Sequence, residues 1–388
     1  MSRPGYTGLV SEGMFSEPLA SAIAEAEQLI AAAPHVDGEA DLAEGLQYLA
    51  GGIAACTHMA FNQHPDHPFL LSGTGPFTKM GLDNPDTLYF GAKLHAGFEY
   101  VIAGVRGTTT DLSFQYLAGE YTDDSVPDSE VAFDDRELDI APDGTFEWRF
   151  TPQRSGQLVI REVYGDWLQR RGSLAIYRAD TVGTAPPSPT RELVQKQFAT
   201  AASELINRVK TWLQFPQWFY LNLPVNTLVA PRVTPGGLTT QYSSAGHFDL
   251  TQDQALIITL PMSDAPYRGF QLGSMWYISL DYINHQTSLN GAQTQVDPDD
   301  KVRIVVADQN PGVTNWAETL GHRRGYLQFR WQRLSREMTA AEGPTVELVE
   351  FDAIPAMLPF FAHNKISEDD WKTRIAVRQA QIGQRMLG

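Results

Sequence analysis

Three segments of the sequence combine carboxylates with aromatic residues, a combination suited to acid–base chemistry on a small substrate. In the first, residues 84–89 read Asn-Pro-Asp-Thr-Leu-Tyr. This composition favours a turn, in which an Asp side chain often only accepts hydrogen bonds from nearby backbone amides. The functional alternative makes Asp86 a base or an anchor at the mouth of a sandwich, with Asn84 and Tyr89 contacting the substrate.

The second segment, residues 158–167, reads Leu-Val-Ile-Arg-Glu-Val-Tyr-Gly-Asp-Trp. Side chains alternate between the two faces of a strand, so Arg161 and Glu162 each fall among apolar neighbours. A buried charge needs a partner, and a structural Arg–carboxylate pair is one explanation. Otherwise the apolar setting makes Glu162 a general acid or base. In that case Arg161, Tyr164 and Trp167 would bind the substrate.

The third segment, residues 276–285, is predicted to continue a strand that begins at Met275. Alternation places Trp276 and Tyr282 on one face of this strand. The other face would carry a polar strip, about 27 Å long at roughly 3.4 Å per residue, made of Tyr277, Ser279, Asp281 and His285. Such a strip is either an exposed polar surface or a binding groove. In a groove, Asp281 and His285 would be catalytic and the three aromatic residues would bind the substrate.

Other polar residues are weaker candidates. His247 precedes a predicted strand, and Arg323 lies in a glycine-flanked loop where it suits an anionic substrate group. The histidines of residues 64–67 lack the helix or strand that usually orients metal ligands, so no metal site is predicted. The sequence also lacks the nucleophile elbow of serine hydrolases, the phosphate-binding loop and the dinucleotide fingerprint. We therefore expect no cofactor.

Composition excludes several classes of partner. The 46 acidic and 29 basic residues leave a net charge of −17, which repels nucleic acid and anionic membranes. The single cysteine, Cys56, cannot form an internal disulfide and fits the apolar pattern of a helix. No apolar run follows the basic residue near the N-terminus, and no stretch is long enough to span a membrane. The expected location is the cytoplasm, and whether the chain forms a homo-oligomer is left open.

The pattern of the chain predicts a mainly β fold, with two β-sandwich or jelly-roll-like domains framed by helices. Helical spacing dominates residues 1–80, with a helix capped by Ser16 and a second one after it. Period-two strands follow in the first sandwich, residues 81–184. After a proline-rich linker, Ser188 is expected to cap a helix within 185–215. A second sandwich, 216–355, begins with a strand at 219–223, and a helical tail capped by Ser367 fills 356–388.

Several of these segments resemble one bacterial family. Residues 83–89, Asp-Asn-Pro-Asp-Thr-Leu-Tyr, are similar to the Asn-x-Asp-Thr-Leu-Tyr segment of the family known as domain of unknown function 1214, often fused to domain of unknown function 1254. The resemblance continues in later segments, which include Asn290 as a binding candidate: 246–250, 267–270, 288–290, 315–316 and 321–325. It implies a two-part, largely β architecture with jelly-roll-like character, and it implies little chemistry.

Two functions from different classes fit these residues. The first is a cofactor-independent enzyme, most simply a glycosidase-like hydrolase, or a lyase or isomerase that uses the same groups. The second is a non-catalytic protein that binds a carbohydrate or another small ligand, because aromatic faces stack on sugar rings and on flat ligands. The enzyme hypothesis requires its four proposed catalytic residues to meet in one pocket: Asp86, Glu162, Asp281 and His285.

Overall fold

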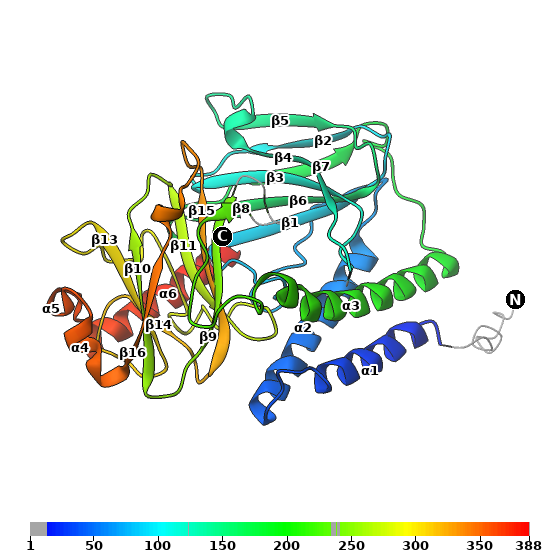
Figure 1. The fold of residues 1–388 in the computed structure, drawn as a ribbon. Coiled ribbons are helices and arrows are strands. Elements are labelled where there is room, and N and C mark those ends of the chain that lie inside the picture. Colours follow the sequence, from blue (N-terminus) through cyan, green and yellow to red (C-terminus); the bar gives the residue numbers. More distant parts are fainter. Residues whose placement is uncertain (1–13, 123, 234–237, 239–240, 388) are drawn as a thin grey trace, which may run out of the picture.

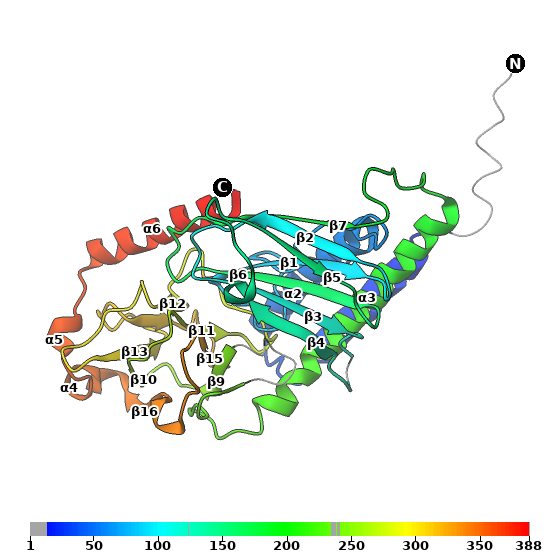
Figure 2. The same cartoon turned by 90° about the horizontal axis from the view of Figure 1, so that it is seen from above.

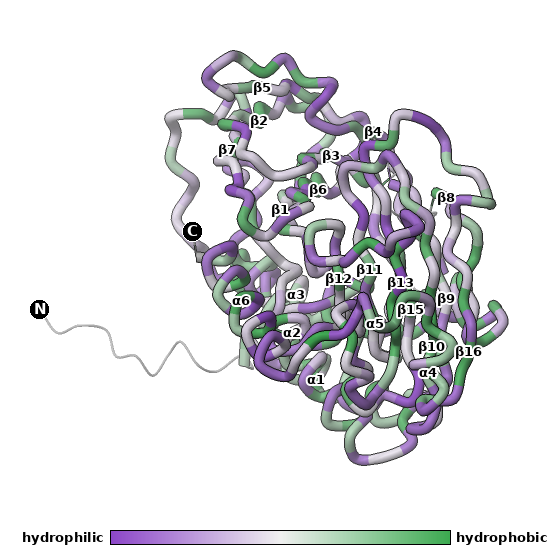
Figure 3. Tube along the Cα trace, turned by 90° about the vertical axis from the view of Figure 1, so that its left-hand side faces the viewer, coloured by the Kyte–Doolittle hydropathy of each residue, from purple (hydrophilic) through white to green (hydrophobic). Residues whose placement is uncertain are grey.

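The computed structural model describes residues 14–122, 124–233, 238 and 241–387, shown as a ribbon in Figure 1. Within these residues, sixteen strands form four sheets, and the longer helices lie near the start, in the middle and at the end of the chain. The protein is therefore mainly β, as the alternating patterns predict. Figure 3 shows hydrophobic and hydrophilic residues interspersed along the strands of these sheets.

The first sandwich packs a four-stranded sheet on a three-stranded sheet. The larger sheet has the order β1 (Thr87–Leu94), β6 (Gly156–Val163), β3 (Asp111–Ala118) and β4 (Asp128–Asp134). The smaller one has the order β5 (Thr145–Phe150), β2 (Tyr100–Val105) and β7 (Ser173–Arg178). Side chains from one face of each sheet fill the core between them, among them Leu112, Phe114, Leu158, Ile160, Tyr100 and Ile102.

The second sandwich is built in the same way from two larger sheets. One has the order β12 (Ser288–Asn290), β11 (Tyr267–Gly273), β15 (Arg324–Gln332), β9 (Gln241–Asp249) and β8 (Arg232–Val233). The other has the order β14 (Trp316–Glu318), β13 (Lys301–Ala307), β10 (Gln254–Pro261) and β16 (Thr345–Glu350). Their shared core includes Phe270, Leu327, Phe329, Trp331, Leu256 and Ile304. The neighbouring strands pair antiparallel except β13 with β14.

Helices cover the sandwiches on two sides. α1 (Glu17–Ala31), α2 (Glu39–Asn62) and α3 (Arg191–Phe219) pack on one another around a core that also holds Trp276. The C-terminal part contains α4 (Ile354–Met357), α5 (Phe361–Asn364) and the longer α6 (Glu368–Leu387). Figure 2 shows α6 running from the second sandwich to the first. None of the helices in the described ranges has the length and apolar character that a membrane span needs.

The structure corrects three predicted elements. Ser16 precedes α1 as expected, but its side chain makes no capping bond. α3 starts after Thr190, whose hydroxyl accepts a hydrogen bond from the backbone N–H of Leu193, so Ser188 is not its cap. Because the helix continues through Pro216 to Phe219, the strand expected at 219–223 does not form.

The strand expected at 275–283 is also wrong. These residues form turns and bends, and Tyr277 has a φ of 56°, in the left-handed region that no strand contains. The segment is therefore a loop between β11 and β12, and alternation does not apply to it. Ser367, by contrast, caps α6 as predicted, since its hydroxyl accepts a hydrogen bond from the backbone N–H of Asp370.

Candidate functional site

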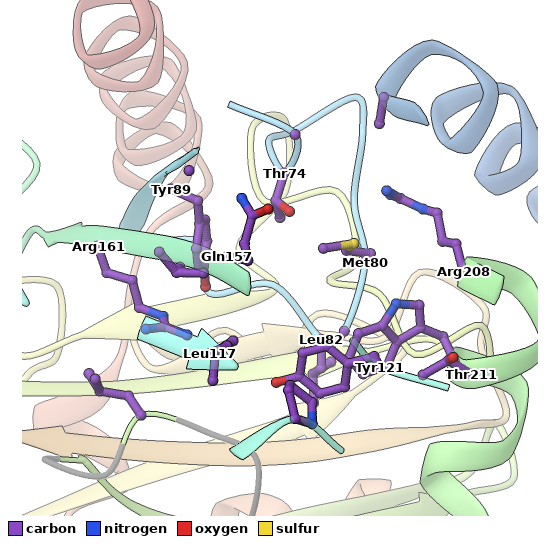
Figure 4. A pocket seen from close by; sticks show the side chains of 18 of the residues that line it. Thr74, Met80, Leu82, Tyr89, Leu117, Tyr121, Gln157, Arg161, Arg208 and Thr211 are labelled. Carbon is purple, nitrogen blue, oxygen red and sulfur yellow. The ribbon is translucent and has the colours of Figure 1, made fainter. Parts of the chain in front are cut away.

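A cavity of about 430 Å³ lies where the two sandwiches and the helical layer meet. Its lining comes from β1 and β6 of the first sandwich, from β9 and β15 of the second, and from α2 and α3. Figure 4 shows Arg161 extending from β6 on one side and Arg208 from α3 on the other. Junctions between domains are where ligand sites preferentially occur.

Strand alternation explains why polar side chains line this cavity. In β6, Leu158 and Ile160 point into the core of the first sandwich, so the residues between and beside them face the cavity: Gln157, Val159 and Arg161. In β15, Leu327, Phe329 and Trp331 fill the core of the second sandwich, and the alternate residues face the cavity: Gln328, Arg330 and Gln332. The two sandwiches thus turn polar faces toward each other.

The two arginines of these faces have neutral partners. Arg161 donates a hydrogen bond to the side-chain oxygen of Gln115, at 2.9 Å. Arg330 donates to the side-chain oxygen of Gln271 and to the backbone oxygen of Leu82. Burial, and to a smaller degree the nearby charge of Arg330, lowers the pKa of Arg161 from its ordinary value. Both arginines line the cavity, and the charge of each acts in the same space.

Aromatic side chains form another part of the cavity wall. Trp212 and Phe215 of α3 lie against Tyr277, and the Trp212 and Tyr277 rings are stacked with centroids 5.8 Å apart. The Tyr277 hydroxyl donates to that of Tyr220, and Tyr220 donates to Gln328. Because each hydroxyl has a partner, these rings are held in fixed positions.

The helical wall adds two polar groups and a thiol. Arg208 donates to the backbone oxygens of Thr78 and Lys79, which holds the loop before β1 against α3. Lys93 and Glu204 form an ion pair between β1 and α3. Burial raises the pKa of Cys56 to about 11, so this thiol is protonated at neutral pH and is a poor nucleophile.

Among the predicted site residues, four line the cavity: Asn84, Tyr89, Arg161 and Tyr277. Tyr89 lies opposite Arg161 in the β1–β6 register, and its hydroxyl accepts a hydrogen bond from the backbone N–H of Asn84. Tyr277 reaches the cavity from the loop after β11, not from the strand that we expected. The structure thus unites members of all three candidate segments.

Asp86 lies next to this cavity but not in its wall. Its carboxylate is buried and accepts hydrogen bonds from three side chains that belong to distant parts of the chain: Trp167, Tyr267 and Asn290. The guanidinium of Arg378 stacks on the Trp167 ring, and that of Arg385 lies over the rings of both Trp167 and Tyr164. Asp86, Tyr164, Trp167 and Asn290 therefore form a buried junction between the sandwiches and α6, not the open mouth of a sandwich.

Glu162 faces away from the cavity because it alternates with Arg161. One of its oxygens accepts hydrogen bonds from the Thr109 hydroxyl and the Gly172 backbone N–H, at 2.9 and 2.7 Å. The other oxygen, Oε2, is buried and has no hydrogen-bond partner in the described part of the chain. Burial raises the pKa of this carboxyl group. No ion pair with Arg161 forms, since the two side chains lie on opposite faces of β6.

Two residues of the third segment have local structural contacts. Asp281 accepts hydrogen bonds from the backbone N–H groups of Ile283 and Asn284, which closes a turn. His285 is 41% exposed and pairs with Glu318 at 2.9 Å. Neither residue borders the cavity.

The remaining binding candidates lie elsewhere as well. Trp276 is buried in the helical core and donates to the backbone oxygen of Asp41, while Tyr282 is buried under α6. His247 contacts the backbone oxygen of Leu223, and Arg323 is exposed and paired with Asp249. These four side chains therefore have structural partners outside the cavity.

The four proposed catalytic residues do not meet. Asp86 is in the junction, Glu162 is on the far face of β6, and Asp281 and His285 are in the loop between β11 and β12, so none of them lines the cavity. Geometry thus gives no support to a joint acid–base role for these residues.

A cluster of three carboxylates lies at one end of the first sandwich. Oxygens of Asp111, Asp134 and Asp135 are within 4.8 Å of one another, close enough to share a cation. Arginines already compensate this charge, because Arg106 and Arg333 pair with Asp135 and Arg136 pairs with Asp134. The cluster is therefore an ion-pair network within the protein.

Sequence reasoning missed Arg330 and its glutamine neighbours in β15. The alternation of large apolar residues with Gln328, Arg330 and Gln332 contained the signal. Trp212 and Phe215 were missed because nothing in a helical sequence indicates that one face of the helix borders a cavity.

Comparison with known proteins identifies the fold and no activity. A solved structure of an uncharacterized protein from Burkholderia cenocepacia has a TM-score of 0.79 and 25% sequence identity, over 89% of this chain and 99% of its own. The VPA0106 protein from Vibrio parahaemolyticus has a TM-score of 0.42 and 11% identity, over 79% and 98%. No protein-family model and no curated protein matches the sequence. The Burkholderia structure supports the mainly β architecture described above.

Proposed function

We propose that this protein binds a small organic molecule in the cavity between the two sandwiches and the helical layer. The observation that supports this most directly is that both sandwiches turn a polar strand face toward the same cavity, although their other faces form apolar cores. A volume of about 430 Å³ falls in the range of roughly 300–1,000 Å³ that is usual for ligand sites.

Binding is favoured over acid–base catalysis by the groups that line the cavity. The carboxylates in the described lining are Glu120 and Glu204, and Glu204 is already paired with Lys93. A glycosidase needs two carboxylates that flank one bond, and the carboxylates proposed for that role lie outside the cavity. The fixed tyrosines and the glutamine-rich faces are instead suited to hold and orient a ligand.

A variant that fills the cavity tests this proposal. Val159 faces the cavity from β6 and is only partly buried, so Val159→Trp places an indole ring in the ligand space. The measurement is a thermal-shift screen of wild type and variant against sugars, phenyl glycosides, organic acids, amides and amines. We expect at least one class to raise the Tm of the wild type and to leave the Tm of Val159→Trp unchanged.

The matched control is Leu348→Trp in β16 of the second sandwich, at a side chain that is 46% exposed and does not line the cavity. It should keep every ligand response of the wild type. If no compound in any class stabilises the wild type, or if Val159→Trp responds as strongly as the wild type, the proposal fails.

A further inference from the structure

Arg161 and Arg330 are two positive charges on facing walls of one cavity, and neither has an acidic partner among the residues that the structure describes. Their hydrogen-bond acceptors are the amide oxygens of Gln115 and Gln271 and the backbone oxygen of Leu82. Buried arginines elsewhere in the described chain are of both kinds: Arg303 is paired with Asp297 and Asp299, whereas Arg378 and Arg385 donate to backbone oxygens. The carboxylates of the described lining, Glu120 and Glu204, form no ion pair with either arginine.

Placing two like charges near each other in a partly desolvated space destabilises the folded protein unless a negative charge joins them. The lowered pKa of Arg161 has burial as its main cause and the charge of Arg330 as another, which agrees with this unfavourable setting. A ligand with a negative group would remove the repulsion, and guanidinium groups bind planar oxyanions with two parallel hydrogen bonds.

A third donor faces the same region. The Tyr89 hydroxyl lies opposite Arg161 in the register and accepts a hydrogen bond from the backbone N–H of Asn84. Because that bond uses an oxygen lone pair, the hydroxyl proton is available to an acceptor in the cavity. Tyr89, Arg161 and Arg330 all line the cavity, so the three groups can act on one ligand.

The rest of the cavity is suited to an apolar ligand body. Trp212, Phe215 and Tyr277 form the aromatic wall described above, and Leu82, Leu117, Val159 and Met80 add aliphatic surface. Figure 4 shows Tyr121, Leu82 and Met80 between Arg161 and Arg208. A strongly hydrated sugar would satisfy the arginines poorly, because it has no charge.

We infer, on the basis of the binding function proposed above, that the ligand is an organic acid: its carboxylate contacts Arg161, Arg330 and Tyr89, and its aromatic or aliphatic body lies against Trp212 and Phe215. This assigns a ligand class to the cavity. It also predicts that removing one of the two charges leaves the Tm of the unliganded protein unchanged or raises it.

The test uses compounds that share an aromatic ring and carry a negative, a neutral or a positive group. Benzoate and 2-naphthoate are compared with benzamide, 2-naphthamide and 2-naphthylmethylamine by thermal shift and by isothermal titration with the full-length protein. We expect the carboxylates to raise the Tm and to bind, whereas the neutral amides and the amine bind roughly 10- to 100-fold more weakly, the usual effect of losing hydrogen bonds to a charged group.

Variants then test whether the two arginines are the groups that bind the carboxylate. Arg161→Gln should weaken 2-naphthoate binding by roughly tenfold or more, with Arg161→Lys intermediate because it keeps the charge and loses the planar fork. Arg330→Gln should weaken binding similarly. Arg323→Gln, which removes an exposed arginine paired with Asp249, is the control and should bind as the wild type does.

The stability of the unliganded variants separates a binding role from a structural one. Arg161→Gln should melt at the same temperature as the wild type or higher, since it removes an uncompensated charge. A clearly lower Tm together with lost binding would make Arg161 structural and overturn the inference. Equal binding of amides and carboxylates, blocked by Val159→Trp, would also overturn it while leaving the cavity as a binding site. If none of these compounds binds, the organic-acid inference falls, and the wider screen described above decides whether the cavity binds another class of ligand.

Discussion

At the scale of single residues, the neighbours of a buried carboxylate decide its effect on stability. Asp86 and Asp111 are both almost fully buried. Asp86 accepts three side-chain hydrogen bonds, whereas Asp111 has Arg333 at 3.4 Å on one oxygen and no hydrogen-bond partner in the described residues on the other. Burial, with the charge of Asp134, raises the pKa of Asp111 to about 6.

This raised pKa makes the stability of the protein fall as the pH rises. Below about pH 4 Asp111 is protonated in both the folded and the unfolded chain, so it costs nothing. Between that pH and about 6 the unfolded chain releases the proton first, and folding then becomes less favourable. Asp111→Asn removes this cost. Relative to the wild type, the free energy of unfolding of the variant should increase by roughly 1 to 3 kcal/mol as the pH rises from 4 to 7.5.

Urea unfolding of both proteins at pH 4, 5, 6 and 7.5 measures this difference. Asp128→Asn is the control, because Asp128 is 74% exposed and its pair with Arg154 lies at the surface. That variant should shift the unfolding midpoint little at any pH. A difference between Asp111→Asn and wild type that stays constant from pH 4 to 7.5 would contradict the raised pKa.

At the scale of elements, α3 carries the helical wall of the cavity, and its first turn depends on Thr190. The Thr190 hydroxyl accepts a hydrogen bond from the backbone N–H of Leu193, 3.1 Å away. One end of this helix is thereby fixed, while Trp212 and Phe215 near its other end line the ligand space. The sequence contains two hydroxyl residues beside prolines in this linker, and only the structure distinguishes them.

Thr190→Ala should lower the free energy of unfolding by about 1 kcal/mol, the usual cost of removing a helix cap. Ser188→Ala is the matched control, because Ser188 is exposed, precedes the helix and makes no capping bond to it. Chemical denaturation of the two variants decides between them. A larger loss for Ser188→Ala than for Thr190→Ala would mean that α3 begins earlier than the structure shows.

At the scale of the whole molecule, Asp86 joins three parts of the protein. Trp167 comes from the loop after β6, and Tyr267 and Asn290 come from the second sandwich. α6 completes the junction: Arg378 donates to the backbone oxygen of Tyr282, and Arg385 donates to that of Pro85. The relative position of the cavity walls therefore depends on this buried junction.

Asp86→Ala should lower the free energy of unfolding by roughly 3 to 5 kcal/mol, because it leaves three buried donors without their acceptor and removes the negative charge near Arg378 and Arg385. Asp281→Ala, which removes a carboxylate whose hydrogen bonds close a local turn, should cost about 1 kcal/mol. Thermal and urea unfolding give both values. Equal losses of stability in the two variants would show that Asp86 does not hold the two sandwiches together.

Local periodicity determined a large part of the fold from sequence alone. Strand-like segments of the sequence became β1, β2, β3, β5, β6, β10, β11, β13 and β15. Apolar and polar residues alternate in β6 and β15, whereas the buried β10 is a nearly continuous apolar run. The same rule separated Arg161 from Glu162 correctly onto opposite faces. It failed at residues 275–283, where a run of aromatic and apolar residues belongs to a buried loop with Tyr277 in the left-handed region.

Only the tertiary structure decided which faces meet. Asn84, Asp86, Tyr267 and Asn290 hydrogen-bond across the junction, and Arg161 and Arg330 face one cavity, although each group comes from distant parts of the chain. Alternation indicates that a polar face exists, but it does not indicate whether solvent, a partner strand or a ligand space covers that face. For that reason the sequence determined the mainly β sandwiches, whereas the position of the site depended on contacts between domains that leave no local pattern.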